Sequence, residues 1–169
     1  AEMPYASDGS ITYENMIERY NADLANTLGN LVNRTIAMTN KYFDGVVQPG
    51  DVTEELDGEL KALAVETVGK GAKLLSEYSD TLDAIFTLAK RCNKYIDETA
   101  PWALAKDESK KARLGTVLYN LLESIRFVAV LLSPFLPETS EKILAQINTD
   151  IKDYDSLSAF GALKAGGLA

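Results

Sequence analysis

A run of amide and basic side chains without acids stands out between residues 24 and 43. On a helix its polar face carries Asn30, Asn33, Arg34 and Lys41, in a chain that has 25 acidic residues and a net charge of −8. Asn30 and Arg34 are four residues apart, so on a helix their side chains lie side by side, roughly 5–6 Å apart at Cβ. Amides donate and accept hydrogen bonds and a guanidinium only donates, a combination that suits the edge of a nucleobase. The alternative is a buried polar seam between helices.

The chain has one tryptophan, Trp102, and it directly follows Pro101. The residue before a proline avoids helical dihedrals, so we expect a helix to end here and Trp102 to lie on a tight corner. An indole on a rigid corner can stack on an unpaired base, which is worth ~1–3 kcal/mol per base. The alternative is that Trp102 anchors the hydrophobic core, as most tryptophans do.

A second group of basic residues, Lys90, Arg91 and Lys94, precedes this corner. Together with the indole it could contact the backbone of a nucleic acid. Cations near the C-terminus of a helix also have a plain structural explanation, because the helix dipole favours them there.

The sequence contains few residues of the types that enzymes use for catalysis. The chain contains no histidine, which removes the commonest general base, the triads that depend on it and most zinc sites. The glycine–lysine run at 69–73 lacks the full phosphate-loop pattern and follows no strand. Cys92 reads as a small core residue. We therefore predict no catalytic residue and no metal site.

Length and composition indicate one ordinary globular domain of 169 residues, 46% of them hydrophobic. No apolar run approaches the ~18 residues of a membrane helix, and the N-terminus lacks a signal peptide's pattern, so no membrane partner is expected. A single cysteine fits a reducing compartment. With a pI near 4.6, any binding of nucleic acid must be local and made largely through bases.

The periodicity of apolar residues predicts an all-α fold, an antiparallel helix bundle of four to five helices. Residues 1–12 read as a lead-in segment, 13–148 as the bundle and 149–169 as a tail that packs partly and frays at Gly166–Gly167. The expected helices span 13–43 with a kink allowed at 21–23, then 53–77, 80–99, 107–133 and 137–148. Gly45 is expected to cap the first helix in a left-handed conformation. No segment shows a convincing strand period.

Three blocks of this sequence closely resemble the anticodon-binding domain of bacterial methionyl-tRNA synthetases, a class I synthetase family. They are YNADLANTLGNLVNRTIAMTNKYFDG at 20–45, NKYIDETAPWALAK at 93–106 and IRFVAVLLSPFLPETSEKI at 125–143. They occur in the family's order and spacing, and the resemblance extends from about residue 3 to 165.

The resemblance implies a helix bundle that receives the CAU anticodon of methionine tRNAs. Asn30 and Arg34 fall where the family contacts the first anticodon base, a cytosine. Trp102, with Pro101 setting its pose, falls where the family has its anticodon-reading tryptophan. Weaker candidates for RNA contacts are Asn33, Lys41, Lys90, Arg91 and Lys94.

The sequence departs from whole synthetases, because it has no HIGH or KMSKS signature and no zinc-knuckle cysteines. We therefore expect an excised piece that cannot activate methionine, from a parent methionine–tRNA ligase. By resemblance, ATP, magnesium and optionally zinc belong to the parent, and this piece needs no cofactor. The expected partners are methionine tRNA and the parent's catalytic domain, and the expected location is the cytoplasm.

A competing hypothesis is a helical scaffold or protein-interaction module without RNA binding. A face that docks a partner helix should present aliphatic anchors, whereas the polar face of 24–43 presents amides and Arg34. A catalytically active bundle has the least support, because histidine and metal ligands are missing.

Overall fold

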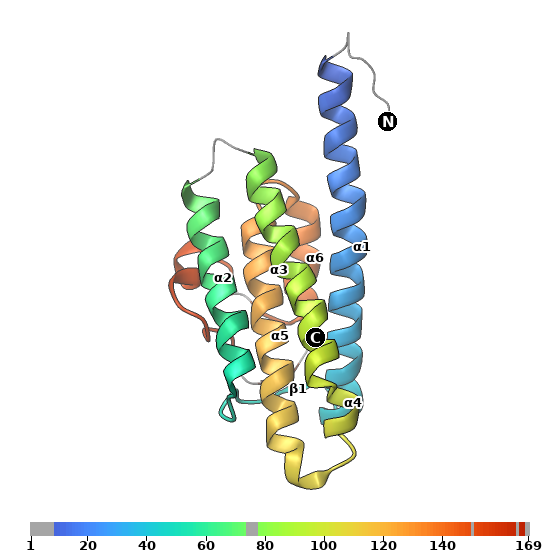
Figure 1. The fold of residues 1–169 in the computed structure, drawn as a ribbon, viewed down its shortest axis with the longest axis vertical. Helices are drawn as coiled ribbons and strands as arrows, with labels where there is room; N and C mark the ends of the chain where they lie inside the picture. Colours follow the sequence, from blue (N-terminus) through green and yellow to red (C-terminus); the bar gives the residue numbers. More distant parts are fainter. Residues whose placement is uncertain (1–8, 74–77, 150, 165, 168–169) are drawn as a thin grey trace.

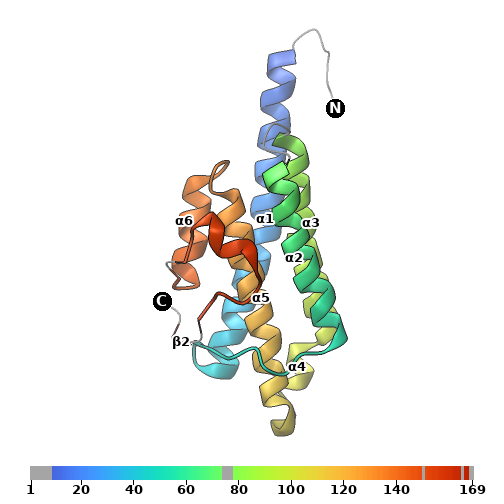
Figure 2. The same ribbon diagram turned by 90° about the vertical axis from the view of Figure 1, so that its left-hand side faces the viewer.

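The protein is a bundle of helices in a computed structural model that describes residues 9–73, 78–149, 151–164 and 166–167 (Figure 1). In chain order its elements are α1 (Gly9–Phe43), β1 (Val46–Val47), α2 (Glu55–Lys73), α3 (Tyr78–Thr99), α4 (Pro101–Leu104), the 3₁₀ turn η1 (Glu108–Lys110), α5 (Lys111–Leu132), α6 (Pro137–Gln146), the 3₁₀ turn η2 (Tyr154–Ser158) and β2 (Gly166–Gly167). The long helices run in alternating directions along the bundle (Figures 1 and 2). The predicted all-α antiparallel bundle is confirmed.

Helix α5 is the centre of this bundle and contacts α1, α2, α3 and α6. Each of its residues from Arg113 to Leu132 is buried, as expected for a helix that is apolar on nearly every side. Among the described residues, one helical stretch, Glu108–Leu132, is long and apolar enough by itself to cross a membrane, but its apolar window lies wholly inside the bundle. The apolar character of α5 is therefore explained by its place in the core.

Helix α3 buries the stripe that the sequence predicts. The inward residues are Leu82, Ile85, Ala89, Cys92 and Ile96. Burial raises the pKa of the Cys92 thiol to about 12, so this cysteine stays protonated and its role is packing, as predicted.

The helix ends differ modestly from those expected. Helix α1 begins at Gly9, so residues 9–12 are helical and not an extended lead-in, and it is continuous to Phe43. Its C-terminus is closed by Gly45, which adopts the predicted left-handed conformation (φ 79°) and donates its N–H to the Thr39 carbonyl at 3.1 Å. The expected end of the second helix at 77 lies outside the described residues.

The expectation that Gly166–Gly167 frays is wrong. These glycines pair antiparallel with Val46–Val47 and form a two-stranded ladder, which contains the strands that the sequence pattern did not reveal. A two-residue strand is too short to show a period, and its partner lies more than a hundred residues away, so periodicity could not predict it.

Buried polar side chains of α5 hold the segment between α6 and β2. Glu123 accepts hydrogen bonds from the backbone N–H groups of Gly161 and Ala162 at 2.7 and 2.8 Å. The same carboxylate pairs with Arg126, whose Nε lies 2.6 Å from Glu123 Oε1, and both side chains are fully buried. The hydroxyl of Tyr119 donates to a carbonyl oxygen of the same segment at 2.6 Å. The tail therefore packs more firmly than predicted.

Candidate nucleic-acid interface

The acid-free strip of α1 is a surface feature. Asn30, Asn33 and Lys41 are exposed, and Arg34 has 39% of its side chain exposed. The hypothesis of a buried polar seam between helices is therefore wrong. The apolar positions of the same helix, such as Leu31, face the core, so the periodicity of α1 directs the amides outward.

Arg34 lies against α3, which packs beside α1. Its Nη1 is 3.4 Å from Asn93 Oδ1 and its Nη2 is 3.4 Å from Asp97 Oδ1. Both distances are long for hydrogen bonds, and Asp97 is 70% exposed, so these contacts orient the guanidinium loosely. Of five N–H donors, Arg34 therefore keeps several for another acceptor.

The corner after α3 presents Trp102 to solvent. Pro101 is buried and Trp102 is 46% exposed, so the proline takes the inward position and the indole the outward one. Ala100 has a left-handed backbone (φ 47°), which turns the chain sharply between α3 and α4. The hypothesis that Trp102 anchors the core does not fit this exposure.

The end of α1 meets this corner at a pocket of about 250 Å³. Its lining includes Lys41 and Tyr42 from α1, Leu104 from α4 and Lys111 from α5. Lys41 follows Arg34 by seven residues, which places both on one face of α1. The exposed strip therefore extends along α1 to the element that carries Trp102.

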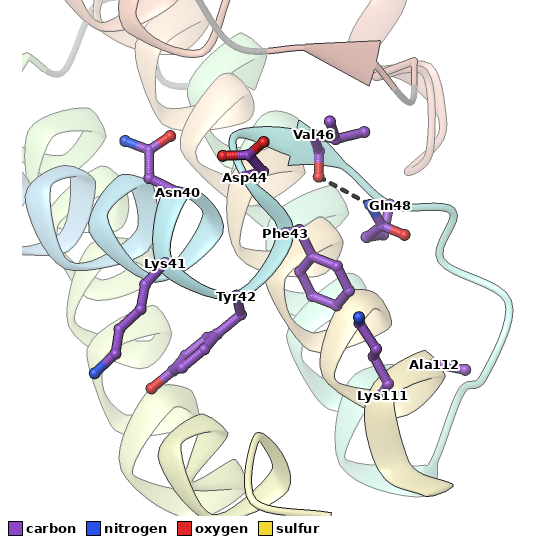
Figure 3. Close-up of a pocket in the computed structure, with 9 residues that line it drawn as sticks. All are labelled: Asn40, Lys41, Tyr42, Phe43, Asp44, Val46, Gln48, Lys111 and Ala112. Carbon is purple, nitrogen blue, oxygen red and sulfur yellow. Dashed lines mark hydrogen bonds between the residues drawn. The ribbon is translucent and has the colours of Figure 1, made fainter. Parts of the chain in front are cut away.

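A larger hollow of about 720 Å³ adjoins this pocket at the junction of α1, β1 and α5 (Figure 3). Figure 3 shows Lys41 and Tyr42 pointing away from Phe43, whose ring faces Lys111. The Lys111 Nζ lies 5.8 Å from the centroid of that ring. Asp44 also lines the hollow, so its walls carry both signs of charge.

The three basic residues of α3 do not form one patch. Arg91 lies 2.8 Å from Glu98 and 3.8 Å from Glu59 of α2, and the Lys94 ammonium lies 3.9 Å from Glu98. Acids thus engage both residues, and the contact with Glu59 shows that Arg91 turns toward α2. Lys90 is exposed and lies over the Phe86 ring at 4.3 Å.

Lys90 also shares a helical face with the residues that contact Arg34. It precedes Asn93 by three residues and Asp97 by seven, which are spacings of one helical face. Lys94 follows Lys90 by four residues and lies near the same face, whereas Arg91 turns toward Glu59 of α2. Lys90 is the basic residue of α3 that is closest in helical position to Asn93 and Asp97.

The sequence reasoning missed Asn93 and Asp97 as neighbours of Arg34. Their four-residue spacing just before Pro101 was the available signal, because it places both on one side of the helix that leads to the corner. It also missed the buried Asp57, whose carboxylate pairs with Arg113 from a position 56 residues away. No local pattern marks that pair.

This fold, with amides and a guanidinium exposed on α1 and an indole exposed at the corner after α3, is that of a helical anticodon-binding domain. The family described as "Anticodon binding domain of methionyl tRNA ligase" matches residues 52–167, and "tRNA synthetases class I (M)" matches residues 1–36. The chain belongs to the family of anticodon-binding domains of methionyl-tRNA ligases.

Relatives and solved structures agree with this assignment. The methionine–tRNA ligase of Clostridium acetobutylicum is 56% identical over 98% of this chain and 26% of its own length, and that of Bacillus subtilis is 52% identical over 96% and 26%. The free-state crystal structure of Mycobacterium tuberculosis methionyl-tRNA synthetase superposes with a TM-score of 0.80 at 29% identity, covering 97% of this chain and 33% of that one. The chain thus spans about a quarter of the length of the curated relatives it matches.

Proposed function

We propose that this domain recognises the CAU anticodon of methionine tRNAs. Asn30 and Arg34 contact the first anticodon base, a cytosine, and Trp102 stacks on an unpaired base with its pose set by Pro101. The observation that carries the proposal is the 46% exposure of Trp102 beside a buried Pro101, because a solvent-facing indole on a fixed corner is a stacking platform.

The hydrogen-bonding groups of Asn30 and Arg34 match the pairing edge of cytosine. The pairing edge of cytosine has two acceptors, O2 and N3, and one donor, the exocyclic amine. Arg34 can donate to the acceptors while the Asn30 carbonyl oxygen accepts from the amine. Uracil reverses the donor and acceptor at two of these positions, so its binding would leave polar groups unpaired, which is costly when they are desolvated.

The net charge of −8 supports contacts with bases over a broad grip on phosphates. The exposed residues Asn33, Lys41 and Lys90 are the better candidates for contacts with the RNA backbone. Arg91 and Lys94 are weaker candidates, because Glu98 already engages both of them.

In a whole methionine–tRNA ligase, this recognition would support ATP-dependent aminoacylation of tRNA in the cytoplasm. The partner within the same chain would be the catalytic domain, where ATP, magnesium and optionally zinc would bind. The residues of this domain do not fit such a site: the chain lacks histidine, and its described part holds no group of three or more Cys, Asp or Glu residues arranged for a metal. We expect this chain alone to be inactive in methionine activation.

The test is a titration of the domain against two labelled anticodon stem-loops at moderate fixed salt, one with CAU and one with UAU. We expect tighter binding of CAU, with the preference lost in Trp102→Ala and Arg34→Ala variants that remain helical by circular dichroism. Equal binding of both stem-loops would overturn base reading, and indifference to RNA in a full-length ligase as well would favour the scaffold hypothesis.

Matched controls are available within the chain. Tyr154 is also 46% exposed but lies in η2, so Tyr154→Ala removes an equally exposed aromatic ring away from the corner. Arg91→Ala removes an arginine that acids already engage. Both variants should retain the preference for CAU.

A further inference from the structure

The chain from Tyr95 in α3 through α4 to Arg113 in α5 forms a helical hairpin that carries Trp102. Both ends of this hairpin contact one buried carboxylate, that of Asp57. Asp57, at the start of α2, lies 2.6 Å from the Tyr95 hydroxyl near the end of α3. Its two oxygens also accept from Arg113 Nη1 and Nη2 at 2.5 and 2.9 Å, near the start of α5. Asn120 donates to the Tyr95 hydroxyl at 3.2 Å. Asp57 and Tyr95 are fully buried, and Arg113 is 8% exposed.

The start of α2 lies at the same end of the bundle as α4 (Figures 1 and 2). Along the hairpin, Tyr95 precedes Trp102 by seven residues and Arg113 follows it by eleven. A single carboxylate of a third helix therefore joins α3 and α5 on either side of the indole.

Backbone hydrogen bonds join the end of α3, one residue beyond Tyr95, to α4. The Ala100 N–H donates to the Ile96 carbonyl at 2.9 Å, and the Leu104 N–H donates to the Ala100 carbonyl at 3.2 Å. Beyond α4, Asp107 accepts from the Ser109 N–H and hydroxyl at 3.0 and 2.7 Å and so closes the turn into η1. A displacement of either end of the hairpin would therefore be transmitted to α4.

Asp57 is ionised at neutral pH. Burial by itself raises the pKa of this carboxyl, but hydrogen bonds from Arg113 and Tyr95 outweigh it and hold the pKa below its ordinary value. A charged acceptor makes the hydrogen bonds to both partners stronger than neutral ones would be.

We infer that Asp57, Tyr95 and Arg113 are positioning residues for RNA recognition, which set the pose of Trp102 by clamping both ends of the corner. This inference rests on the proposed function of Trp102 and extends it to residues that do not touch RNA. Binding sites lose affinity when the shell that supports a contact residue loosens, even if that residue is intact.

The experiment measures Trp102 directly, because it is the chain's sole tryptophan and its fluorescence reports on this corner alone. Asp57→Asn keeps the shape of the side chain and removes its charge, and Tyr95→Phe removes one hydroxyl. Without RNA, we expect a faster decay of tryptophan fluorescence anisotropy in both variants while circular dichroism stays helical. Binding of the CAU stem-loop should weaken by roughly threefold to tenfold, a part of what stacking provides.

A double-mutant cycle separates positioning from general destabilisation. If Asp57 acts through the indole, Asp57→Asn should weaken CAU binding in the Trp102 protein and have no effect in a Trp102→Ala background. An equal loss in both backgrounds, or unchanged anisotropy decay and binding in folded Asp57→Asn, would overturn the inference. If Asp57→Asn fails to fold, the same cycle with Tyr95→Phe decides.

Glu123→Gln is the matched control, since it alters the other buried carboxylate–guanidinium pair of α5. It should lower the free energy of unfolding without changing the Trp102 signal, and an equal change there would overturn the inference. If the wild-type domain shows no preference for CAU, the proposed function fails, while the anisotropy measurements without RNA still decide whether the cluster positions Trp102.

Discussion

Pro101 and Trp102 are adjacent yet have opposite environments, one buried and the other 46% exposed. The proline ring is apolar and its nitrogen has no hydrogen to satisfy, so it can be buried at a chain turn without leaving a donor unpaired. The neighbouring indole takes the outward position, where nearly half of its surface is accessible. A tryptophan exposed to this extent buries less apolar surface than a core tryptophan, and its exposure is consistent with the proposed binding role.

We therefore predict a graded effect of substitutions at Trp102. Trp102→Ala should weaken binding of the CAU stem-loop by ~1–3 kcal/mol, and Trp102→Phe should weaken it less, because a smaller aromatic ring still stacks. Both should change the free energy of unfolding by only about 0.5 kcal/mol, as is usual at surface sites. Isothermal titration and urea denaturation measure the two quantities. A large loss of stability with no separable loss of binding would contradict this prediction.

At the scale of elements, α3 has two polar faces with different surroundings. On the side of α2, Arg91 lies near both Glu98 and Glu59. On the side of α1, Lys90 is exposed near the residues that contact Arg34. Acids thus offset the charge of Arg91, whereas the Lys90 ammonium lies over the Phe86 ring on the face beside α1.

This asymmetry predicts different dependences on salt. Lys90→Ala should weaken RNA binding and reduce the slope of log K against log salt by up to about 1, because one contact with a phosphate is lost. Arg91→Ala should leave that slope nearly unchanged, because the Arg91 guanidinium of the wild-type domain is already paired with Glu98. Titrations with the CAU stem-loop at several salt concentrations test this, and equal slopes for both variants would contradict it.

Two glycines in helices have contrasting surroundings. A Cβ added at Gly58 in α2 meets no atom within 4 Å, whereas one added at Gly115 in α5 would lie 2.8 Å from Gln48 Cβ. Gly115 therefore allows the chain after β1 to approach α5 closely.

We predict that Gly58→Ala raises the free energy of unfolding by about 0.4–1 kcal/mol, since alanine costs less conformational entropy in a helix. Gly115→Ala should lower it, because the Gln48 backbone would have to move. Thermal or urea denaturation of the pair provides the comparison. Equal stabilisation by both would mean that the approach to Gln48 is not tight.

At the scale of the whole molecule, ion pairs buried along α5 join distant parts of the chain. Asp57–Arg113 joins α2 to α5, and Glu123–Arg126 holds the segment before β2. Breaking one partner of such a pair is strongly destabilising, because it leaves a buried charge uncompensated. The stability of the bundle should therefore depend on the ionisation of Asp57.

The pKa of Asp57 is below its ordinary value of 3.8 in the folded protein, so on acidification the unfolded state binds this proton first. The stabilisation from Asp57 is thus present at neutral pH and is lost as the pH falls below 3.8 and through the folded pKa. We predict that acid lowers the free energy of unfolding less steeply in Asp57→Asn than in wild type. Urea denaturation across this range tests it, with the exposed Asp153→Asn as control, and identical pH profiles would contradict it.

The sequence by itself determined the long helices and the family. Apolar periodicity defined the helices to within a few residues, Gly45 ended α1 as expected, and Pro101 marked the corner after α3. These features depend on interactions between residues close in sequence, so local reasoning was sufficient. The resemblance in three blocks led to the family that the comparisons confirm.

Only the tertiary structure decided which residues share a surface and which share the core. It exposed Trp102, separated Lys90 from Arg91, paired β1 with β2 and brought Asp57 to Arg113. Each outcome depends on how helices pack, because a helical period says that a face is polar but not which neighbour covers it. Contacts between residues far apart in sequence arise from that packing, which no local pattern encodes.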